Sequence, residues 1–295
     1  NAAAAALVLS DDERARLAER LPAGTRARPR RAATPRDGDG EVVMIMGIAG
    51  AGKSRAAEAL TGRGYLRLNR DERGGTLRGL AQALGQALER GERRVVLDNT
   101  YLGRASRADV IEAAARHGLP VRCVFVDTPV PQAQVNLCLR LVDHFGTLPG
   151  PEEIRASKLP GIMGPMPLFR QARELEPPAA DEGFAGIETV AFTRAPSPEL
   201  LAGAVVPLEE MPVPPREPPT LALGWRPGRG AFSLEGDIAV CPHPAGPPVC
   251  WCRPPLPGAV VAWARRRGVD LARVTVLGGS PTFRALARAF TPPAG

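Results

Sequence analysis

The most constraining feature of the sequence is a loop pattern that joins an apolar run to a helical stretch. The run at residues 42–46, "VVMIM", leads directly into Gly47-x-x-x-x-Gly52-Lys53-Ser54, where the helical stretch begins. Glycines permit the tight curl that points successive backbone N–H groups at one anion, and the helix N-terminus adds its positive dipole end. The spacing predicts a phosphate-binding loop, with Lys53 on the β- and γ-phosphates of a nucleotide and the Ser54 hydroxyl on Mg²⁺.

The choice of lysine supports this interpretation. Lys53 is one of only two lysines among the 38 basic residues of the chain. A Gly/Ala-rich turn at the start of a helix, the structural alternative, does not explain that choice. We therefore expect ATP and Mg²⁺ as cofactors. The residues expected to contact the nucleotide are Gly47, Ala49, Gly50, Ala51, Gly52, Lys53, Ser54 and Arg55.

Apolar runs alternate with helical stretches after this loop. Strands are expected at residues 42–46, 64–69, 94–98, 121–127 and 187–192. Helices are expected near residues 53–61, 74–90, 105–117, 131–143 and 165–173. Strands that alternate with helices of this length indicate βαβ units. The sequence therefore predicts an α/β fold with a parallel sheet and flanking helices.

Composition divides the chain into four parts. Residues 1–40 are expected to form a short amphipathic helix near 11–20 and a basic linker. Residues 41–205 carry the βαβ pattern, and residues 206–220 hold six prolines that exclude a regular element interior. Residues 221–295 are expected to form a small α/β module, with strands at 236–240 and 273–278 and helices near 258–268 and 281–290.

An aspartate follows or ends each of the two apolar runs after the loop. Asp71 follows the run at 64–69, and Asp98 ends the run at 94–98. Open α/β sheets hold their ligands at the carboxyl ends of the strands. Asp71 is therefore a candidate to accept the proton of an attacking hydroxyl, and Asp98 to hold the hydration shell of Mg²⁺ or to orient the acceptor. Singly, each aspartate also fits a helix cap or turn.

These motifs resemble those of the kinase domain of polynucleotide 5′-hydroxyl kinases, including the polynucleotide kinase-phosphatases. The resemblance covers about residues 41–195 and rests on "GAGKS", "GYLRLNRD", "RRVVLDNT", "SRADVIEAAARHGLPVRCVFVDTPVPQAQ" and "ELEPPAADEGFAGI". It implies a P-loop kinase fold and an ATP-dependent phosphotransferase. By position, Asp71 is then the general base and Asp98 the second acidic residue. Arg140 is the lid arginine that clamps the transferring phosphoryl group.

Two residues depart from the pattern of that family. Cys138 stands where the kinase-phosphatases often have the first of two lid arginines, and Tyr101 replaces the usual Asn after "DNT". Both departures concern the acceptor more than the chemistry. Arg140 by itself also fits a solvated helix surface.

A second group of functional residue types lies in "CPHPAGPPVCWC". Cys241, His243, Cys250 and Cys252 are four good ligands, close enough in sequence to surround one tetrahedral ion. Cysteines are often buried as small hydrophobes, but the prolines between these ones make a regular buried strand or helix improbable. We expect a structural zinc ion, since a single compact four-ligand site is typical of zinc.

Residues 236–290 resemble the zinc-loop histidinol-phosphate and heptose-bisphosphate phosphatases of the haloacid-dehalogenase superfamily. Those enzymes use an Asp-x-Asp pair at a strand end, a lysine after the zinc loop and acidic Mg²⁺ ligands. Here Pro254 stands at the lysine position, and Gly279 and Phe283 stand at the acidic positions. The chain has one Asp-x-Asp, Asp37 and Asp39, and it follows an Arg/Pro linker. The resemblance implies a degenerate module without phosphatase activity, a pseudophosphatase.

The net charge of the chain indicates what kind of partner it binds. The net charge is +7, and residues 216–295 are rich in arginine. Such a balance favours polyanions, here the 5′-hydroxyl ends of RNA or DNA, although a solvated arginine-rich surface also fits. Two alternatives are a kinase of a small-molecule hydroxyl (a nucleoside or sugar) and a nucleic-acid-binding module with an ATP switch. Asp71 and Arg140 count against the switch, which needs neither. The sequence indicates no particular oligomeric state.

Compartment follows from cysteine usage and hydropathy. Three of the five cysteines lie in the metal-like group, which favours a reducing compartment. No stretch resembles a signal peptide or a membrane span of about 20 apolar residues. We therefore expect a cytoplasmic protein without a membrane partner.

Overall fold

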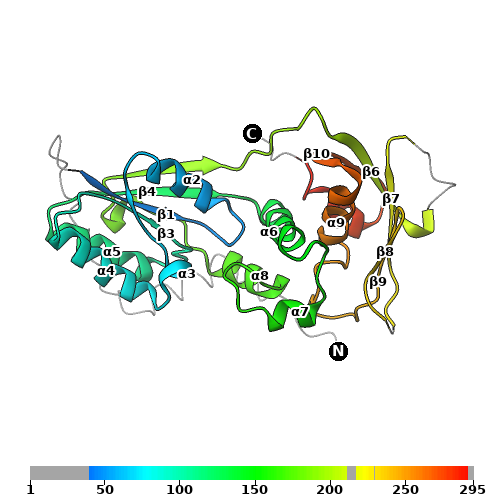
Figure 1. Cartoon of the computed structure of the whole chain (residues 1–295), viewed down its shortest axis with the longest axis horizontal. Helices are drawn as coiled ribbons and strands as arrows, with labels where there is room; N and C mark the ends of the chain where they lie inside the picture. Colours follow the sequence, from blue (N-terminus) through cyan, green and yellow to red (C-terminus); the bar gives the residue numbers. More distant parts are fainter. Residues whose placement is uncertain (1–39, 211–216, 229, 292–295) are drawn as a thin grey trace, which may run out of the picture. The chain divides into compact units, whose positions relative to one another are not determined.

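The computed structural model describes residues 40–210, 217–228 and 230–291, whose elements include two five-stranded sheets (Figure 1). The helix expected near 11–20, the linker up to residue 39, and Asp37 and Asp39 lie outside the described residues. None of the described helices has both the length and the hydropathy that a membrane crossing requires.

The first sheet has the strand order β2-β3-β1-β4-β5, and all its neighbouring strands are parallel. Its strands are β1 (Glu41–Met46), β2 (Leu66–Leu68), β3 (Arg94–Asp98), β4 (Val121–Asp127) and β5 (Gly186–Ala191). Each strand falls on an apolar run that the sequence pattern selected, which confirms the expected α/β fold. The pattern works because strands covered on both faces are nearly continuous in apolar residues.

Helices connect these strands and cover both faces of the sheet. They are α2 (Lys53–Thr61), α3 (Arg70–Arg73), α4 (Leu77–Glu89), α5 (Arg104–Arg116), α6 (Val130–Phe145), α7 (Pro151–Ala156), α8 (Pro165–Glu174) and the 3₁₀ turn η1 (Ala180–Glu182). Successive side chains of β1 alternate between faces. Val43 and Ile45 belong to the core that α2 and α6 cover, whereas Val42 and Met44 belong to the core under α4 and α5.

The second sheet has the order β10-β6-β7-β9-β8, with only β8 antiparallel to its neighbour. Its strands are β6 (Leu201–Pro207), β7 (Thr220–Trp225), β8 (Ser233–Glu235), β9 (Ile238–Cys241) and β10 (Val269–Val276). The remaining elements are the 3₁₀ turn η2 (Leu208–Glu210) and the helices α9 (Gly258–Arg267) and α10 (Pro281–Ala287).

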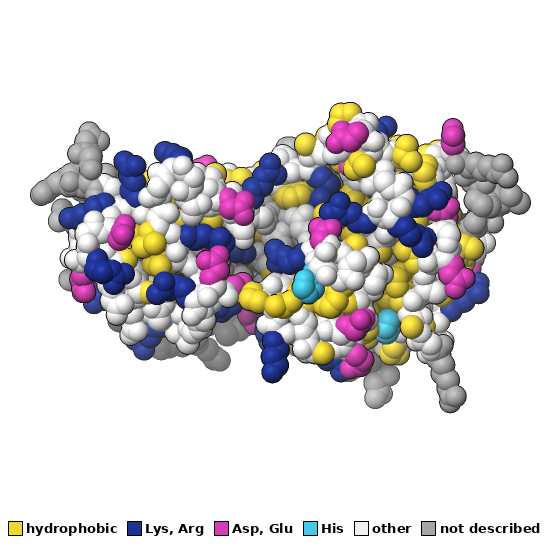
Figure 2. Space-filling view, in the orientation of Figure 1, with side chains coloured by type: hydrophobic (Ala, Val, Ile, Leu, Met, Phe, Trp, Pro, Cys, Tyr) yellow, Lys and Arg dark blue, Asp and Glu magenta, His cyan; other side chains and the backbone are white. Residues whose placement is uncertain are grey.

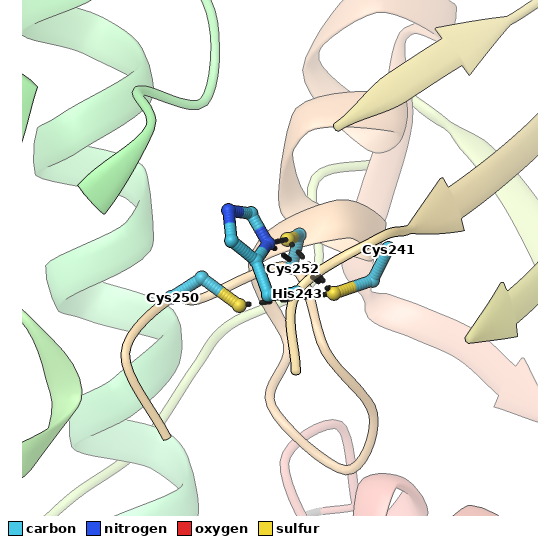
Figure 3. Close-up of side chains that lie close together, drawn as sticks. All are labelled: Cys241, His243, Cys250 and Cys252. Atoms are coloured by element: carbon cyan, nitrogen blue, oxygen red, sulfur yellow. Dashed lines mark hydrogen bonds between the residues drawn. The ribbon is translucent and has the colours of Figure 1, made fainter. Parts of the chain in front are cut away.

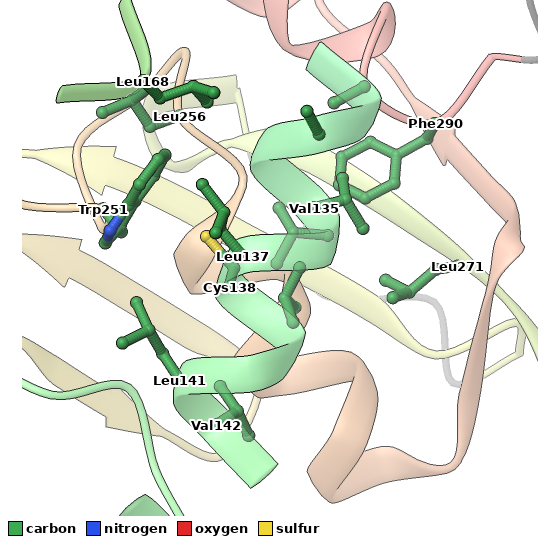
Figure 4. Close-up of a cluster of buried hydrophobic side chains, with 14 of the residues drawn as sticks. Val135, Leu137, Cys138, Leu141, Val142, Leu168, Trp251, Leu256, Leu271 and Phe290 are labelled. Atoms are coloured by element: carbon green, nitrogen blue, oxygen red, sulfur yellow. The ribbon is translucent and has the colours of Figure 1, made fainter. Parts of the chain in front are cut away.

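Helix α9 is buried on every side through residue 264. It contacts β7 and β10 of the second sheet and also packs against α6 of the first. A helix that is apolar all round requires such cover. Its close approach to the sheet requires Gly203 on β6, where a Cβ would lie 2.8 Å from the Trp263 ring. One continuous apolar core therefore runs from the first sheet through α6 and α9 to the second (Figure 4).

Strand β6 changes the domain boundary that we propose. The sequence placed residues 201–205 at the end of the kinase segment, but β6 pairs with β7 and β10. Its run "LAGAVVP" consists of small residues beside a proline-rich stretch, so it carried no strand signal. Pro207 is tolerated because it is the last residue of the strand. We therefore propose that the C-terminal module begins before Leu201.

A buried ion pair anchors α5 to the segment before β5. Arg107 is fully buried, and its Nε and Nη2 donate to Glu182 at 2.6 and 2.8 Å. Its Nη1 donates to the carbonyl oxygens of Tyr101 and Glu176. The guanidinium therefore joins the start of α5 to the segment that holds Glu176 and Glu182, which lie 69 and 75 residues further along the chain.

We expect Glu182→Ala to lower the free energy of unfolding by about 3–5 kcal/mol, because it leaves the Arg107 charge buried without a counterion. The measurement is urea denaturation followed by circular dichroism. Asp181→Ala is the matched control: it removes the neighbouring, exposed partner of Arg104 and should leave the midpoint nearly unchanged. Equal midpoints for the two variants would contradict the anchoring role.

Candidate active site

The phosphate loop, residues 47–54, follows β1 and ends in the first turn of α2. Gly47, Gly50 and Gly52 have φ values of 148°, 75° and 99°, which L side chains rarely adopt. A Cβ on Gly50 would lie 2.5 Å from the Ala133 carbonyl oxygen, and one on Gly47 would lie 2.7 Å from that of Val126. Backbone strain and close approach therefore both require glycine here.

Side chains from neighbouring elements hold the backbone of the loop. Gln171 on α8 accepts from the Ala49 N–H at 2.8 Å. Asn136 on α6 donates to the Gly50 carbonyl at 2.8 Å, and the Thr128 hydroxyl donates to that of Ala51 at 2.8 Å. These contacts fix the curl of the loop before any ligand binds.

Lys53 lies at the start of α2, and its Nζ donates to the Ile48 carbonyl at 2.8 Å. Burial lowers the pKa of Lys53 to about 8; the charge of Asp98 opposes this effect and that of Arg140 adds to it. The amine therefore remains mostly charged at neutral pH and loses its proton as the pH rises through about 8. A phosphate group beside it would restore the charged form.

An acidic group lies at the carboxyl ends of β2 and β3. Asp98 is buried, and it accepts from Arg67 Nη2 at 2.5 Å and from Asn69 Nδ2 at 3.3 Å. Asn69 also caps α3, since its Oδ1 accepts from the Asp71 N–H at 2.7 Å. The buried Asp98 therefore fixes the short helix that carries the exposed Asp71. Arg67 holds the same helix by an ion pair with Glu72 at 3.0 Å.

Arg140 projects from α6 toward the turn at residues 159–163. Its Nη1 donates to the Gly161 carbonyl at 3.4 Å. Gly161 has φ +77°, and a Cβ there would collide with the guanidinium. The turn is thus shaped to accept the arginine.

These side chains surround one cavity of about 400 Å³, hereafter the phosphate pocket. The expected site residues that line it are Ala49, Gly50, Gly52, Lys53, Ser54, Arg55, Asp71, Asp98 and Arg140. Those that sequence reasoning missed are Asn69, Arg70, Asn99, Thr100, Gly161, Met163 and Gln171. Asn69 and Asn99 follow strands and were detectable as polar residues at carboxyl ends. Gln171 meets the loop across 122 residues and left no local signal.

Two of the residues expected to contact the nucleotide, Gly47 and Ala51, do not contribute to the lining, because they are buried within the phosphate loop. Cys138 is fully buried and faces the apolar core, whereas Arg140, two positions along α6, is exposed. Tyr101 is also fully buried. The two departures from the kinase pattern, Cys138 and Tyr101, are therefore absent from the described lining of the phosphate pocket.

The four expected metal ligands form a compact cluster, hereafter the metal cluster (Figure 3). All four ligand atoms lie within 4.8 Å of one another. Cys241 Sγ is 3.8 Å from Cys250 Sγ and 3.3 Å from Cys252 Sγ, and His243 Nδ1 is 3.2 Å from Cys252 Sγ. A tetrahedral zinc ion with Zn–S bonds of about 2.3 Å places its sulfur ligands about 3.8 Å apart. The donor set therefore fits zinc.

The metal cluster is assembled from two ends of one loop. Cys241 ends β9, and Cys250 and Cys252 precede α9. Hydrogen bonding among the three thiols lowers the pKa of Cys250, whereas the pKa values of Cys241 and Cys252 are raised. A thiolate is the form that binds metals.

A second cavity of about 450 Å³, hereafter the edge cavity, lies at the carboxyl ends of strands in the second sheet. Gly224 and Trp225 at the end of β7, Arg253 beside the metal cluster, and Ser280 after β10 contribute to it. The Trp225 indole N–H donates to the His243 carbonyl at 2.7 Å, and the Arg253 guanidinium lies 5.5 Å from the ring centroid. This tryptophan is 40% exposed. The edge cavity thus presents an aromatic face and a cation.

Comparison with known proteins supports the class of fold. Residues 42–140 match a protein-family model described as an AAA domain. With the strand–loop–helix geometry and the parallel sheet, this match gives the chain an α/β P-loop kinase fold.

A curated relative is the bifunctional polynucleotide phosphatase/kinase of Schizosaccharomyces pombe (strain 972), which is 28% identical over 155 residues. The match covers 52% of this chain and 34% of that protein, so the chain spans about a third of the length of its relative.

Several solved structures are similar to this chain, with low scores. They include Chaetomium thermophilum Kti12 in complex with ADP-AlF3 (TM-score 0.39, 14% identity, 51% of this chain and 89% of that one). A fungal RNA kinase has TM-score 0.39, 10% identity and coverage of 54% and 78%. A gluconokinase from Sinorhizobium meliloti 1021 has TM-score 0.35, 20% identity and coverage of 53% and 85%. Scores this low transfer no property to this chain.

We expect nucleotide binding to take up protons above about pH 8. In the free protein Lys53 is increasingly neutral above this pH, whereas bound phosphates hold it charged, so affinity falls as the pH rises through about 8. Calorimetric titrations with ADP at pH 8.5 in buffers of different ionisation enthalpy measure the uptake. Lys53→Arg is the control, because arginine stays charged and should take up no proton. Equal heats in both buffers for the unmodified protein would contradict this assignment.

Proposed function

We propose that this chain is an ATP-dependent kinase that transfers the γ-phosphate to a 5′-hydroxyl end of RNA or DNA. The observation that carries the proposal is the composition of the phosphate pocket. Lys53, Asp71, Asp98 and Arg140 come from distant parts of the chain, and all four line this one cavity. A general base, a lysine and an arginine that neutralises the transferring phosphoryl group, all beside a phosphate loop, form a sufficient set for phosphoryl transfer.

Each of these residues has a role that its position supports. Asp71 accepts the proton of the attacking hydroxyl as the new O–P bond forms and the bond to the β-phosphate oxygen breaks. Lys53 and Arg140 neutralise the charge on the phosphoryl oxygens. Asp98 is engaged with Arg67 and Asn69, which suits it to orienting the acceptor side by fixing α3.

The oxygen donors of the pocket suit Mg²⁺. The Ser54 hydroxyl and the carboxylates of Asp71 and Asp98 line the same cavity, and Mg²⁺ prefers oxygen ligands. Ser54 is the residue expected to bind it. When bound, the ion would neutralise charge between the β- and γ-phosphates.

Three observations favour a polynucleotide over a small acceptor. The edge cavity combines the exposed Trp225 with Arg253, and a base stacks readily on such an aromatic face. Figure 2 shows Lys and Arg side chains distributed widely over the visible face. The matched relative is named for its action on polynucleotides. We infer that the C-terminal module helps to hold a polyanionic substrate.

The same module is proposed to have no phosphatase activity. Pro254 and Phe283, which occupy the positions of a lysine and an acid in the resembling phosphatases, both line the edge cavity. Among the described residues that line it, Glu209 is the sole acid, and no aspartate is present to act as a nucleophile. The expected pseudophosphatase therefore stands as part of the proposal.

We expect the protein to transfer labelled γ-phosphate from ATP to 5′-hydroxyl oligonucleotides. Asp71→Ala should lower kcat by about 10²–10⁴-fold, because the hydroxyl loses its base, and should leave ATP affinity unchanged. Glu58→Ala is the control: it removes an exposed carboxylate of α2 that is absent from the described lining of the pocket. An Asp71 variant as active as the Glu58 variant would contradict the assignment.

The acceptor class is decided in the same assay. Trp225→Ala should raise KM for an oligonucleotide by about 5–100-fold and leave KM for a nucleoside unchanged, since stacking contributes about 1–3 kcal/mol per base. Transfer to a nucleoside or sugar but to no oligonucleotide would establish the small-molecule alternative. ATP hydrolysis without transfer to any acceptor would favour the nucleic-acid-binding switch.

We also propose that the metal cluster holds a structural zinc ion. Metal analysis of the purified protein should find about one zinc per chain, and Cys250→Ala should abolish it and lower the thermal midpoint. Cys123→Ala, which removes a buried cysteine of β4, is the control and should retain the metal. A metal-free chain with an unchanged midpoint would refute the structural role.

A further inference from the structure

Trp251 lies between two ligands of the metal cluster, Cys250 and Cys252, and is fully buried. Its indole Nε1 donates to the Met163 carbonyl at 2.9 Å, a contact that spans 88 residues. Figure 4 shows its ring beside Leu168 and Leu256 on the side of α6. The residue between the metal ligands thus belongs to the core that supports the first sheet.

Met163 connects Trp251 to the phosphate pocket. Met163 and Gly161 both line the pocket, and Gly161 accepts the hydrogen bond of Arg140. The turn at residues 159–163 therefore accepts a hydrogen bond from Arg140 at Gly161 and one from Trp251 at Met163. A shift of Trp251 would move the carbonyl to which it is bonded and, with it, the wall of the pocket.

Helix α8 provides a second connection. Leu168 is fully buried in the same core as Trp251. Gln171, one turn further along, accepts the Ala49 N–H of the phosphate loop. Residues three apart lie on neighbouring positions of a helix surface. One short rigid segment of α8 therefore both packs in the core that contains Trp251 and bonds to the phosphate loop.

The backbone of Trp251 is fixed from the other side. Its carbonyl accepts the Gly258 N–H at 3.0 Å, and a Cβ on Gly258 would lie 2.7 Å from that oxygen. The start of α9 therefore packs directly on the segment between the ligands. A metal that joins Cys250 and Cys252 to Cys241 and His243 removes the remaining freedom of this segment.

We propose that Trp251 is a positioning residue for the phosphate pocket, and that through it metal binding and nucleotide binding strengthen each other. The proposal rests on two parts of the proposed function: that a nucleotide occupies the phosphate loop and that a zinc ion occupies the metal cluster. Without the metal, the loop populates conformations in which Trp251 releases Met163, and the competent fraction of the pocket falls. Linkage makes the effect reciprocal: nucleotide must strengthen the equilibrium binding of the metal by the same free energy.

The test is equilibrium binding of ADP to the full chain, with zinc and after removal of zinc by a chelator. We expect affinity to fall by about tenfold without zinc, within the usual range of coupling between sites. ADP should raise the affinity for zinc by the same factor. Circular dichroism reports whether the metal-free chain remains folded.

Two tryptophan variants separate positioning from general stability. Trp251→Phe keeps an aromatic ring in the core but lacks the indole N–H. This variant should still bind one zinc, and its zinc-loaded form should bind ADP several-fold more weakly than the unmodified protein. Removal of zinc should then lower its ADP affinity less than it does in the unmodified protein. Trp263→Phe is the matched control. Trp263 is equally buried, its indole bonds to Asp237, and it is absent from the described lining of the phosphate pocket. It should retain normal ADP affinity and coupling.

Zinc-independent ADP affinity in the folded protein would overturn the proposal, as would equal behaviour of the two variants. If the metal-free chain unfolds, the zinc-loaded variants decide, because the hydrogen bond to Met163 is then tested directly. ADP binding that depends on zinc, without transfer to any acceptor, supports the coupling and refutes the kinase. Phosphate transfer to an acceptor together with zinc-independent ADP affinity supports the kinase and refutes the coupling. If the protein does not bind ADP at all, both the kinase and the coupling are refuted.

Discussion

The structure depends on the two faces of helix α6. Asn136 and Arg140, one turn apart, lie on its polar side, where the first holds the Gly50 carbonyl and the second reaches the turn at residues 159–163. Leu137, Cys138 and Leu141 lie on the other side and are buried in the core shared with α9. Because a helix is rigid along its length, this core sets the position of the side chains that act on the phosphate pocket.

The phosphate pocket contains one buried carboxylate, Asp98, and one exposed carboxylate, Asp71. Asp98 is buried, where an unpaired carboxylate would be costly, and the Arg67 guanidinium compensates it. Asp71 is exposed and is held in place through its backbone by Asn69. The buried pair can therefore provide rigidity while the exposed carboxylate remains available to a ligand. Lys53, partly covered by the loop, carries a charge that depends on what lies beside it.

Local sequence signals predicted the elements that local physics determines. The phosphate loop was detectable because glycine spacing fixes its curl, and the inner strands β1, β3 and β4 because their apolar runs are covered on both faces. Strand β6 was missed. It contains Gly203, and the reason for a glycine inside this strand is the close approach of the distant Trp263 ring. The bonds of Gln171 to Ala49 and of Trp251 to Met163 join distant segments, and no periodicity encodes such pairs. The roles assigned to Asp71, Asp98 and Arg140 stay predictions.

The loop that carries the metal ligands explains why a metal is useful there. Prolines at 242, 244, 247 and 248 remove backbone donors, so this segment gains little from regular hydrogen bonding. Yet it must place Trp251 in the core, where the indole donates to the Met163 carbonyl, and hold the His243 carbonyl that accepts from Trp225 of β7. A cross-link among four side chains fixes such a segment without secondary structure. The same constraint then acts on both tryptophans: Trp251 is bonded to Met163, a residue of the phosphate pocket, and Trp225 contributes to the edge cavity.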